Sequence, residues 1–311
     1  MKTGCADGVS RMVQAVVTTV LFAMSAVSAG RSTRLLGAGV ANLSRLALAT
    51  IFLALWAHTA GQGIGGVALP WLLASGVIGF GLGDLALYAA YYRIGPRLAV
   101  LLCLCLAAPM GAVIEWAWLG TRLTLAQIFW SATILVGVFA ALAPDTRTPV
   151  AAPAWSLGIL LGTIAAFGQG SGAVLTRKAF DTARAAGQHI DGGTAAYQRI
   201  LGGLLLTAVV LLIGHWRKSS AVAHETNATD HPWRRAWPWV VANALAGPAL
   251  GVACYQWALA VAPTGIVLSI IALTPLVVIP FTMVLDGERP TLRSLIGGAV
   301  AVLGAVALAY R

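Results

Sequence analysis

One carboxylate in this sequence, Asp84, lies where a charge is costly, about two-thirds of the way along an apolar segment. A charged side chain at the centre of a bilayer costs about 2.5–3.5 kcal/mol even on the lenient insertion scale. Gly81, Asp84, Tyr88 and Tyr91 recur at helical spacing, which predicts one polar, aromatic face that looks into a helix bundle. Two roles for Asp84 stay open: substrate or proton handling, and a structural ion pair, for example with Arg45.

Other charged side chains also stand inside apolar segments. Arg45 lies ten residues into its segment, with Asn42 and Ser44 nearby. It is a candidate for holding an anionic group of a substrate, or the carboxylate of the ion pair. Arg199, 154 positions later, opens a second apolar helix in a similar way, and Glu115 lies near the end of another. For these two residues we expect side chains that reach out to the membrane interface.

Polar and aromatic residues of the second half are candidate substrate contacts. Gln169 and Ser171 lie in a glycine-rich cluster, which can mark a flexible or broken point of a helix near a binding site. Tyr255 and Trp257 could line a cavity, and such rings suit amino acids, nucleosides, sugars and drugs alike. In the same segment as Gln169, small residues at every fourth position favour close helix packing: Gly158, Gly162, Ala166 and Gly170.

The C-terminal stretch, residues 272–311, consists of two apolar segments with a short polar break between them. Glu288 lies in this break, beside Pro290, a residue that suits the first turn of a helix. A carboxylate there favours the positive end of the helix dipole, so we interpret Glu288 as a structural cap of the hairpin. A coupling carboxylate is the alternative. Pro275, and Pro109 in the first half, are expected to occupy equivalent structural places.

The composition indicates a membrane protein. Hydrophobic residues make up 59% of the 311 residues and charged residues 10%, and the mean hydropathy is +0.85. A soluble domain carries roughly 25% charged residues. The net charge of +10 does not indicate nucleic-acid binding, because Lys and Arg sit in short loops between apolar runs.

The apolar runs are long enough to cross a bilayer as helices, and backbone groups in hydrocarbon must be satisfied within the segment. We therefore predict an all-α polytopic membrane protein. Its ten expected transmembrane helices are 12–29, 35–57, 69–92, 97–119, 124–143, 155–176, 195–215, 237–260, 264–285 and 291–310.

The two halves of the sequence are related. Each half holds five segments, an odd number, so a second copy must enter the membrane from the opposite side. We therefore predict two inverted five-helix repeats, residues 1–148 and 149–311, an architecture that recurs in secondary transporters. At an offset of 167 positions the matching pairs are Tyr88 and Tyr255, Pro96 and Pro263, Gly120 and Gly287, Thr124 and Thr291, and Gly137 and Gly304.

Together these features resemble the EamA type of the drug/metabolite transporter superfamily. The resemblance rests on the run 255–259, Pro275, and Gly287-Glu288-Arg289-Pro290-Thr291 before Gly297-Gly298 and Gly304, with a weaker copy in the first half. Two features depart from the family. Thr121 stands where the family has a Glu as the partner of Glu288, and residues 58–69 hold no Lys or Arg.

The expected location is the cell (inner) membrane, where the protein is an integral multi-pass protein. The resemblance implies cytoplasmic termini, whereas the distribution of Lys and Arg leans weakly toward external termini. We follow the resemblance and expect both termini in the cytoplasm.

The favoured function is a secondary transporter that moves small metabolites or drugs by alternating access, exchanged against another solute or coupled to an ion such as a proton. The alternatives are a polytopic intramembrane enzyme and a non-transporting sensor or assembly subunit. An enzyme would need a nucleophile and a base at depth, and Ser171 lacks the Gly-x-Ser-x-Gly pattern, so we predict that the protein is not an enzyme. We expect no cofactor and no metal, and the absence of a Walker motif argues against direct use of ATP. The expected partners are a small-molecule solute and the lipid bilayer.

Overall fold

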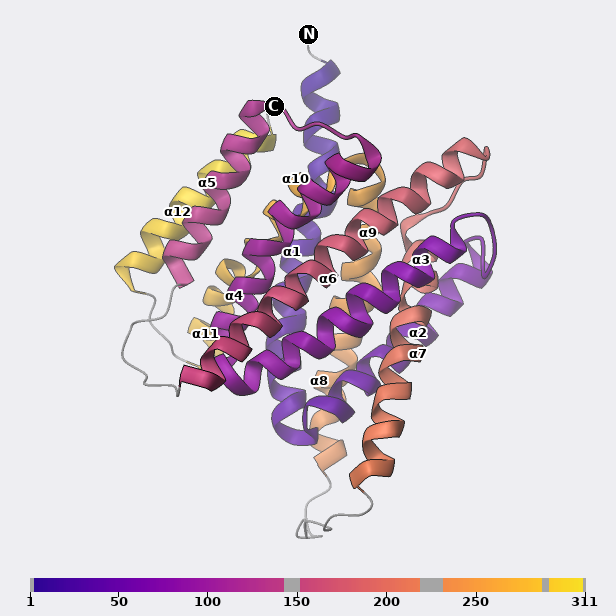
Figure 1. Ribbon diagram of the computed structural model, residues 1–311, viewed down its shortest axis with the longest axis vertical. Coiled ribbons are helices and arrows are strands. Elements are labelled where there is room, and N and C mark those ends of the chain that lie inside the picture. The colour runs from indigo at the N-terminus through magenta and orange to yellow at the C-terminus, as the bar shows by residue number, and fades with distance from the viewer. Residues whose placement is uncertain (1–2, 143–151, 219–231, 287–290, 310–311) are drawn as a thin grey trace.

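The computed structural model describes residues 3–142, 152–218, 232–286 and 291–309, and its regular elements are all helices (Figure 1). In chain order they are α1 (Thr3–Leu36), α2 (Ala38–Thr59), α3 (Leu69–Gly76), the π-helix η1 (Val77–Gly83), α4 (Asp84–Leu119), α5 (Leu125–Leu142), α6 (Ala152–Ala185), α7 (Gly192–Lys218), α8 (Pro232–Ala244), the π-helix η2 (Leu245–Ala249), α9 (Leu250–Val261), α10 (Thr264–Ile271), α11 (Thr274–Asp286) and α12 (Leu292–Ala309).

Nine helical stretches in these ranges are long and apolar enough to cross a bilayer, and Leu292–Leu308 is a shorter apolar helix. Large apolar side chains are exposed on their outer faces, for example Leu125 at 86% and Val284 at 85%. Such surface is stable only when lipid replaces water around it. The prediction of an all-α polytopic membrane protein is therefore confirmed.

Helix α4 runs without a break through residues 93–96, so the boundary expected between the spans 69–92 and 97–119 is wrong. Two other helices continue beyond the apolar runs that predicted them. Helix α1 passes through Arg31, whose guanidinium lies 5.2 Å from the ring centre of Trp239. Helix α6 passes through Lys178, whose ammonium group lies 6.0 Å from the ring centre of Trp71. Because a cation can stack on an aromatic ring at the edge of the apolar region, the basic residue does not end the helix.

The expected span 264–285 consists of two helices, α10 and α11, with a turn at residues 272 and 273 between them. The physical reason is Pro275, which has no backbone N–H to continue α10 and suits the first turn of α11. Pro109, by contrast, lies inside α4, so the two prolines differ in local structure. Glu288 lies outside the described residues, and its capping role stays a prediction.

Glycines on α6 let the first-half helices approach it closely. A Cβ at Gly168 would stand 2.8 Å from the Cα of Gly83, and one at Gly170 would stand 3.0 Å from the backbone nitrogen of Gly111. These approaches leave no room for a side chain on α6 at either position. The interpretation of the small-residue stripe as a packing surface is confirmed at Gly170.

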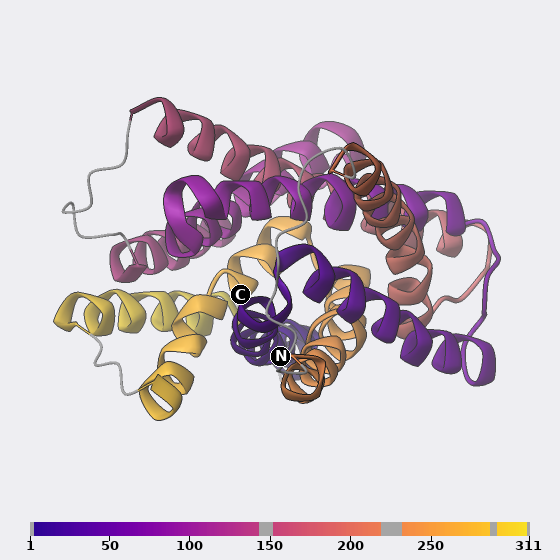
Figure 2. The ribbon, with the colours of Figure 1, turned by 90° about the horizontal axis from the view of Figure 1, so that it is seen from below.

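The bundle is arranged around α1, which is seen nearly end-on near the middle of Figure 2. It packs against α8, α9 and α11 of the second half, while α3 and η1 pack against α6 and α7, and α4 packs against α6. Helices α5 and α12 form a pair at one edge, on the left of Figure 1. Glycines also allow close packing of α5 against α12, because a Cβ at Gly137 would stand 2.6 Å from the backbone nitrogen of Ala301.

The two π-helical segments occur at the offset that relates the two halves of the sequence. Shifting η1 by 167 positions gives residues 244–250, which contain η2. In η2, Pro248 cannot donate an α-helical hydrogen bond, and three of the seven residues of η1 are glycine. Single turns of π-helix are frequent at functional sites of membrane and soluble proteins, so both segments direct attention to the residues that follow them.

Candidate functional site

The first polar group of the bundle forms around Asp84, the residue directly after η1. Asp84 is only 7% exposed. Its Oδ2 lies 3.3 Å from Nη2 of Arg45 on α2, and its Oδ1 accepts a hydrogen bond from Nε2 of Gln169 on α6 at 3.2 Å. Arg45 also donates from Nε to Oδ1 of Asn42 at 2.8 Å. The structure thus brings together three predicted site residues, Asp84, Arg45 and Gln169, from both halves of the chain.

The second polar group forms around Arg199 on α7, a helix that packs against η1, the segment directly before Asp84. Arg199 is 1% exposed, so the expectation that it reaches the membrane interface is wrong. The reason is that the loop between α2 and α3 covers this end of α7: Gln198 donates from Nε2 to the carbonyl oxygens of Gly63 and Gly65, both at 3.0 Å. The position of Arg199 in the sequence alone could not show that this loop packs over the start of α7.

Arg199 is held by aromatic rings and by space that glycines leave. Its guanidinium carbon lies 4.9 Å from the ring centre of Phe80 in η1 and 5.4 Å from that of Tyr255 on α9. A Cβ at Gly79 would stand only 2.6 Å from its Nη2. Nη1 donates to Oε1 of Gln256 at 3.4 Å, a long hydrogen bond. Cation–π contact therefore supplies much of what stabilises this buried charge.

Three buried donors beside one another lack acceptors. Within the described part of the chain, the Nε of Arg199, the Nε2 of Gln256 and the hydroxyl of Tyr255 donate to no acceptor. Gln256 is 0% and Tyr255 4% exposed. Buried polar groups are nearly always hydrogen-bonded, and leaving one unpaired costs about 1–3 kcal/mol. The predicted residue Tyr255 is therefore part of the site. Gln256 was missed, although an amide within an apolar segment was a usable signal.

The remaining predicted residues lie apart from this group or cannot be placed. Trp257 is 38% exposed and packs against Gly192 at the start of α7. Ser171 lies two residues from Gln169, which puts it on the opposite side of α6. The side chain of Tyr88 lies outside the described residues. The structure therefore does not bring Ser171 or Trp257 to Asp84.

A second buried ion pair joins four helices, α4, α6, α9 and α10, at one end of the bundle. Glu115 on α4 is 2% exposed, and its Oε1 lies 2.6 Å from Nε of Arg177 on α6. Its Oε2 accepts from the backbone N–H of Thr264, the first residue of α10, at 2.6 Å. Arg177 donates from Nη1 to the carbonyls of Leu259 and Ala262 at the end of α9, at 2.9 and 2.5 Å. The expectation that Glu115 reaches the interface is wrong, because α6 and α10 cover it.

Asp191, which lies outside the spans, fixes the start of α7. Its Oδ1 accepts from the backbone N–H groups of Gly193 and Thr194 and from Nε1 of Trp56, at 2.8, 3.0 and 2.9 Å. Burial raises the pKa of this carboxyl, but its hydrogen bonds with Thr194, Trp56 and the backbone outweigh burial, so its pKa lies below the ordinary value. This cap holds the helix two turns before Arg199.

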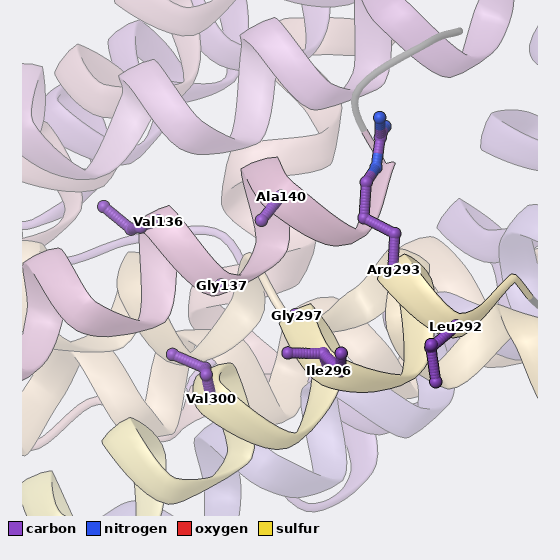
Figure 3. A pocket seen from close by; sticks show the side chains of 8 residues that line it. All are labelled: Val136, Gly137, Ala140, Leu292, Arg293, Ile296, Gly297 and Val300. Atoms are coloured by element: carbon purple, nitrogen blue, oxygen red, sulfur yellow. The ribbon is translucent and has the colours of Figure 1, made fainter.

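Two cavities of the described chain are not lined by Asp84, Arg45 or Arg199. One of about 640 Å³ is lined by residues of α4, α5 and α10, among them Pro109, Ser131 and Ser269. A smaller one of about 390 Å³ lies between α5 and α12 (Figure 3). Its lining is apolar apart from Arg293, and Gly137 and Gly297 face each other across the two helices. Neither cavity offers the converging donors found around Arg199.

Comparison with known proteins agrees with this architecture. The sequence model described as the EamA-like transporter family matches residues 156–310, which contain Gln169, Arg199, Tyr255 and Gln256. A crystal structure of another protein is similar to the chain, with a TM-score of 0.69 and 18% sequence identity over 94% of both chains. At that identity the similarity concerns the fold alone. No curated protein sequence matches the chain.

Proposed function

Because the chain belongs to the EamA-like transporter family, part of the drug/metabolite transporter superfamily, we propose that it is a secondary transporter of small metabolites or drugs. In this proposal the solute binds at the two polar groups around Asp84 and Arg199, which we together call the central site. Residues 1–148 and 149–311 act as inverted repeats that expose the central site to either side of the membrane in turn. The integral multi-pass protein resides in the cell membrane with cytoplasmic termini, and acts as a transporter rather than an enzyme.

The observation that carries this proposal is a group of buried polar side chains inside apolar spans. Asp84, Arg199 and Gln256 are 7%, 1% and 0% exposed. A charge at the middle of a bilayer is expensive, and residues retained there usually line substrate or ion pathways. Arg45 and Asp84 come from the first half and Arg199 and Gln256 from the second, which is where repeat-built transporters bind their solutes.

Alternating access needs points at which the helices can bend on either side of the central site. The segments η1 and η2 directly precede the helices that carry Asp84 and Tyr255. Both lack regular α-helical hydrogen bonding and are rich in glycine or proline, so they change shape at lower cost than an unbroken helix. We assign the opening movements to these two segments, and the closed state to the conformation described above.

Coupling is assigned to the ion pair of Arg45 and Asp84. A proton on Asp84, or an anionic solute group on Arg45, removes the attraction that joins α2 to α4 at 3.3 Å. Either event frees the partner residue, so binding at the central site and movement of these helices become linked. In exchange, a second solute takes the place of the proton: its binding weakens the pair of Arg45 and Asp84, and its release restores the pair.

The test is uptake and counterflow in vesicles that contain the purified protein. The panel holds an amino acid, an organic acid, a nucleoside, an organic amine and a sugar, each with and without a proton gradient. The proposal expects saturable exchange of at least one solute, and a change of that exchange or of its pH dependence in Asp84→Asn. The matched control is Asp181→Asn, which removes a carboxylate from a surface pair with Arg184 outside the central site. Vesicles that exchange no solute at all would contradict the transporter.

A further inference from the structure

We infer that the transported solute carries a carboxylate, and that Arg199, Tyr255 and Gln256 bind this group. The inference rests on the proposed transporter function and adds the class of substrate to it. What carries it is a buried guanidinium without an anionic partner, surrounded by donors that have no acceptor.

The ion pairs of the described residues set Arg199 apart from the other arginines inside the bundle. Arg45 has Asp84 within 3.3 Å, and Arg177 has Glu115 within 2.6 Å. In the ranges that the structure describes, no carboxylate lies within 4.0 Å of the Arg199 side chain. Yet Arg199 is more deeply buried than either, at 1% exposure. Buried charges are normally paired, so this guanidinium is suited to receive an anion from outside the chain.

At Arg199 and its two polar neighbours, three donors lack an acceptor, while Oε1 of Gln256 is already taken by Nη1 of Arg199. The Nε of Arg199, the Nε2 of Gln256 and the hydroxyl of Tyr255 donate to no acceptor among the residues whose placement is described. A carboxylate consists only of acceptors, with about four lone-pair sites on two oxygens. An ammonium group would bring more donors and a second positive charge to the same place. The chemistry around Arg199 therefore selects an anionic group of the solute and rejects a cationic one at that place.

The charge of the central site favours a group with a single negative charge. Arg45, Arg199 and Asp84 together carry one net positive charge when Asp84 is ionised. One carboxylate neutralises this charge, whereas a phosphate monoester carries about −1.5 to −2 and would leave a buried excess of negative charge. A site whose charges sum to zero with the solute bound has the lowest electrostatic free energy in a low-dielectric interior.

The geometry leaves the Nε of the guanidinium without a partner, while Nη1 makes only the long hydrogen bond to Gln256. The rings of Phe80 and Tyr255 lie 4.9 and 5.4 Å from its carbon atom and stack on the group. An arginine held by its faces presents its N–H groups in the plane, where they match the two oxygens of a carboxylate. Gly79 and Gly172 keep side chains away from Nη2, since a Cβ there would stand 2.6 and 3.3 Å from it.

The experiment compares carboxylates with their own amides on the wild-type protein in vesicles. Exchange is measured with labelled phenylalanine, lactate and benzoate, and with labelled phenethylamine and uridine as cationic and neutral probes. Each accepted carboxylate then competes against its unlabelled carboxamide. We expect exchange of at least one carboxylate, with the amide competing at least about 10-fold more weakly, because a hydrogen bond to a charged group carries that selectivity. This comparison does not depend on the folding of any variant.

Two variants then assign the selectivity to this group of residues. Arg199→Gln should abolish the preference for carboxylate over carboxamide. Tyr255→Phe retains the ring on Arg199, removes only the hydroxyl, and should weaken carboxylate binding about 10-fold. Two results would overturn the inference while leaving the transporter intact: exchange of phenethylamine or uridine without any carboxylate, and equal competition by acid and amide. If no probe exchanges at all, the proposed function fails and the inference fails with it.

Discussion

Removing the charge of Glu115 should destabilise the protein strongly, through Arg177. In Glu115→Gln the amide oxygen can still accept from Thr264, but the guanidinium 2.6 Å away loses its anion inside the bundle. Breaking a buried pair from one side costs about 3–5 kcal/mol. Since Arg177 keeps the carbonyls of Leu259 and Ala262, we expect the lower end of this range, about 3 kcal/mol.

The partner substitution completes a double-mutant cycle. Arg177→Met removes the guanidinium but leaves Glu115 charged and the two carbonyls without a donor, so about 4–5 kcal/mol is expected. The double variant contains neither charge and should cost less than the sum of the single variants by about 2 kcal/mol or more. Unfolding of purified protein in mixed detergents, followed by tryptophan fluorescence, measures all four species. Costs that add within about 0.5 kcal/mol would refute the reasoning, because they would mean that the two charges do not interact.

Three further perturbations have defined outcomes. Asp84→Asn should still fold and insert but change transport or its pH dependence, and assays beside Arg45→Gln test this; transport with unchanged pH dependence would make Asp84 structural. Gly170→Ala should cost about 1–3 kcal/mol in unfolding assays because its Cβ would stand 2.9 Å from a backbone carbonyl of α4, whereas Gly30→Ala, with nothing within 4 Å, should not destabilise. Asp191→Ala should cost about 1 kcal/mol at pH 7; because the folded-state pKa of Asp191 is lowered, its contribution is present above the unfolded pKa of about 3.9 and should vanish as the pH falls below that value.

The sequence predicted the helices well because few backbone structures can cross a bilayer. Apolar runs without charges have to be helices, so the helical class followed from length and composition, although the break expected at residues 93–96 lies inside α4. Pro275 marked a place where the ninth expected span breaks in two. The depth of Asp84 predicted that it needs a partner, and Arg45, named as that partner, lies 3.3 Å away.

Predictions of burial from the sequence were wrong where an element distant in the sequence packs over the end of a helix. Arg199 lies five residues into its predicted segment, a position typical of the interface, but the loop after α2 closes over it through Gln198. Glu115 lies near the end of its span, yet the extension of α6 and the start of α10 bury it. Linear distance from the end of an apolar run measures depth only when no other element covers that end.

The repeat relation stays a prediction that gains support from local structure. The coincidence of η1 and η2 at an offset of 167 positions is independent of the residue identities that define this offset. Gly137 and Gly304, which correspond at the same offset, both lie in the contact between α5 and α12. A repeat with inversion expects such pairs to meet near the axis that relates the two halves.

The most direct test of the central claim is the accessibility of the central site from the two sides of the membrane. Gln169→Cys is introduced into a variant in which Cys5, Cys103, Cys105 and Cys254 have been replaced by Ala. A charged thiol reagent that cannot cross the bilayer is then added to right-side-out and to inside-out vesicles. Alternating access predicts that the thiol at position 169 reacts from both sides and that a transported solute slows both reactions. Reaction from one side only, or from neither, would contradict the account.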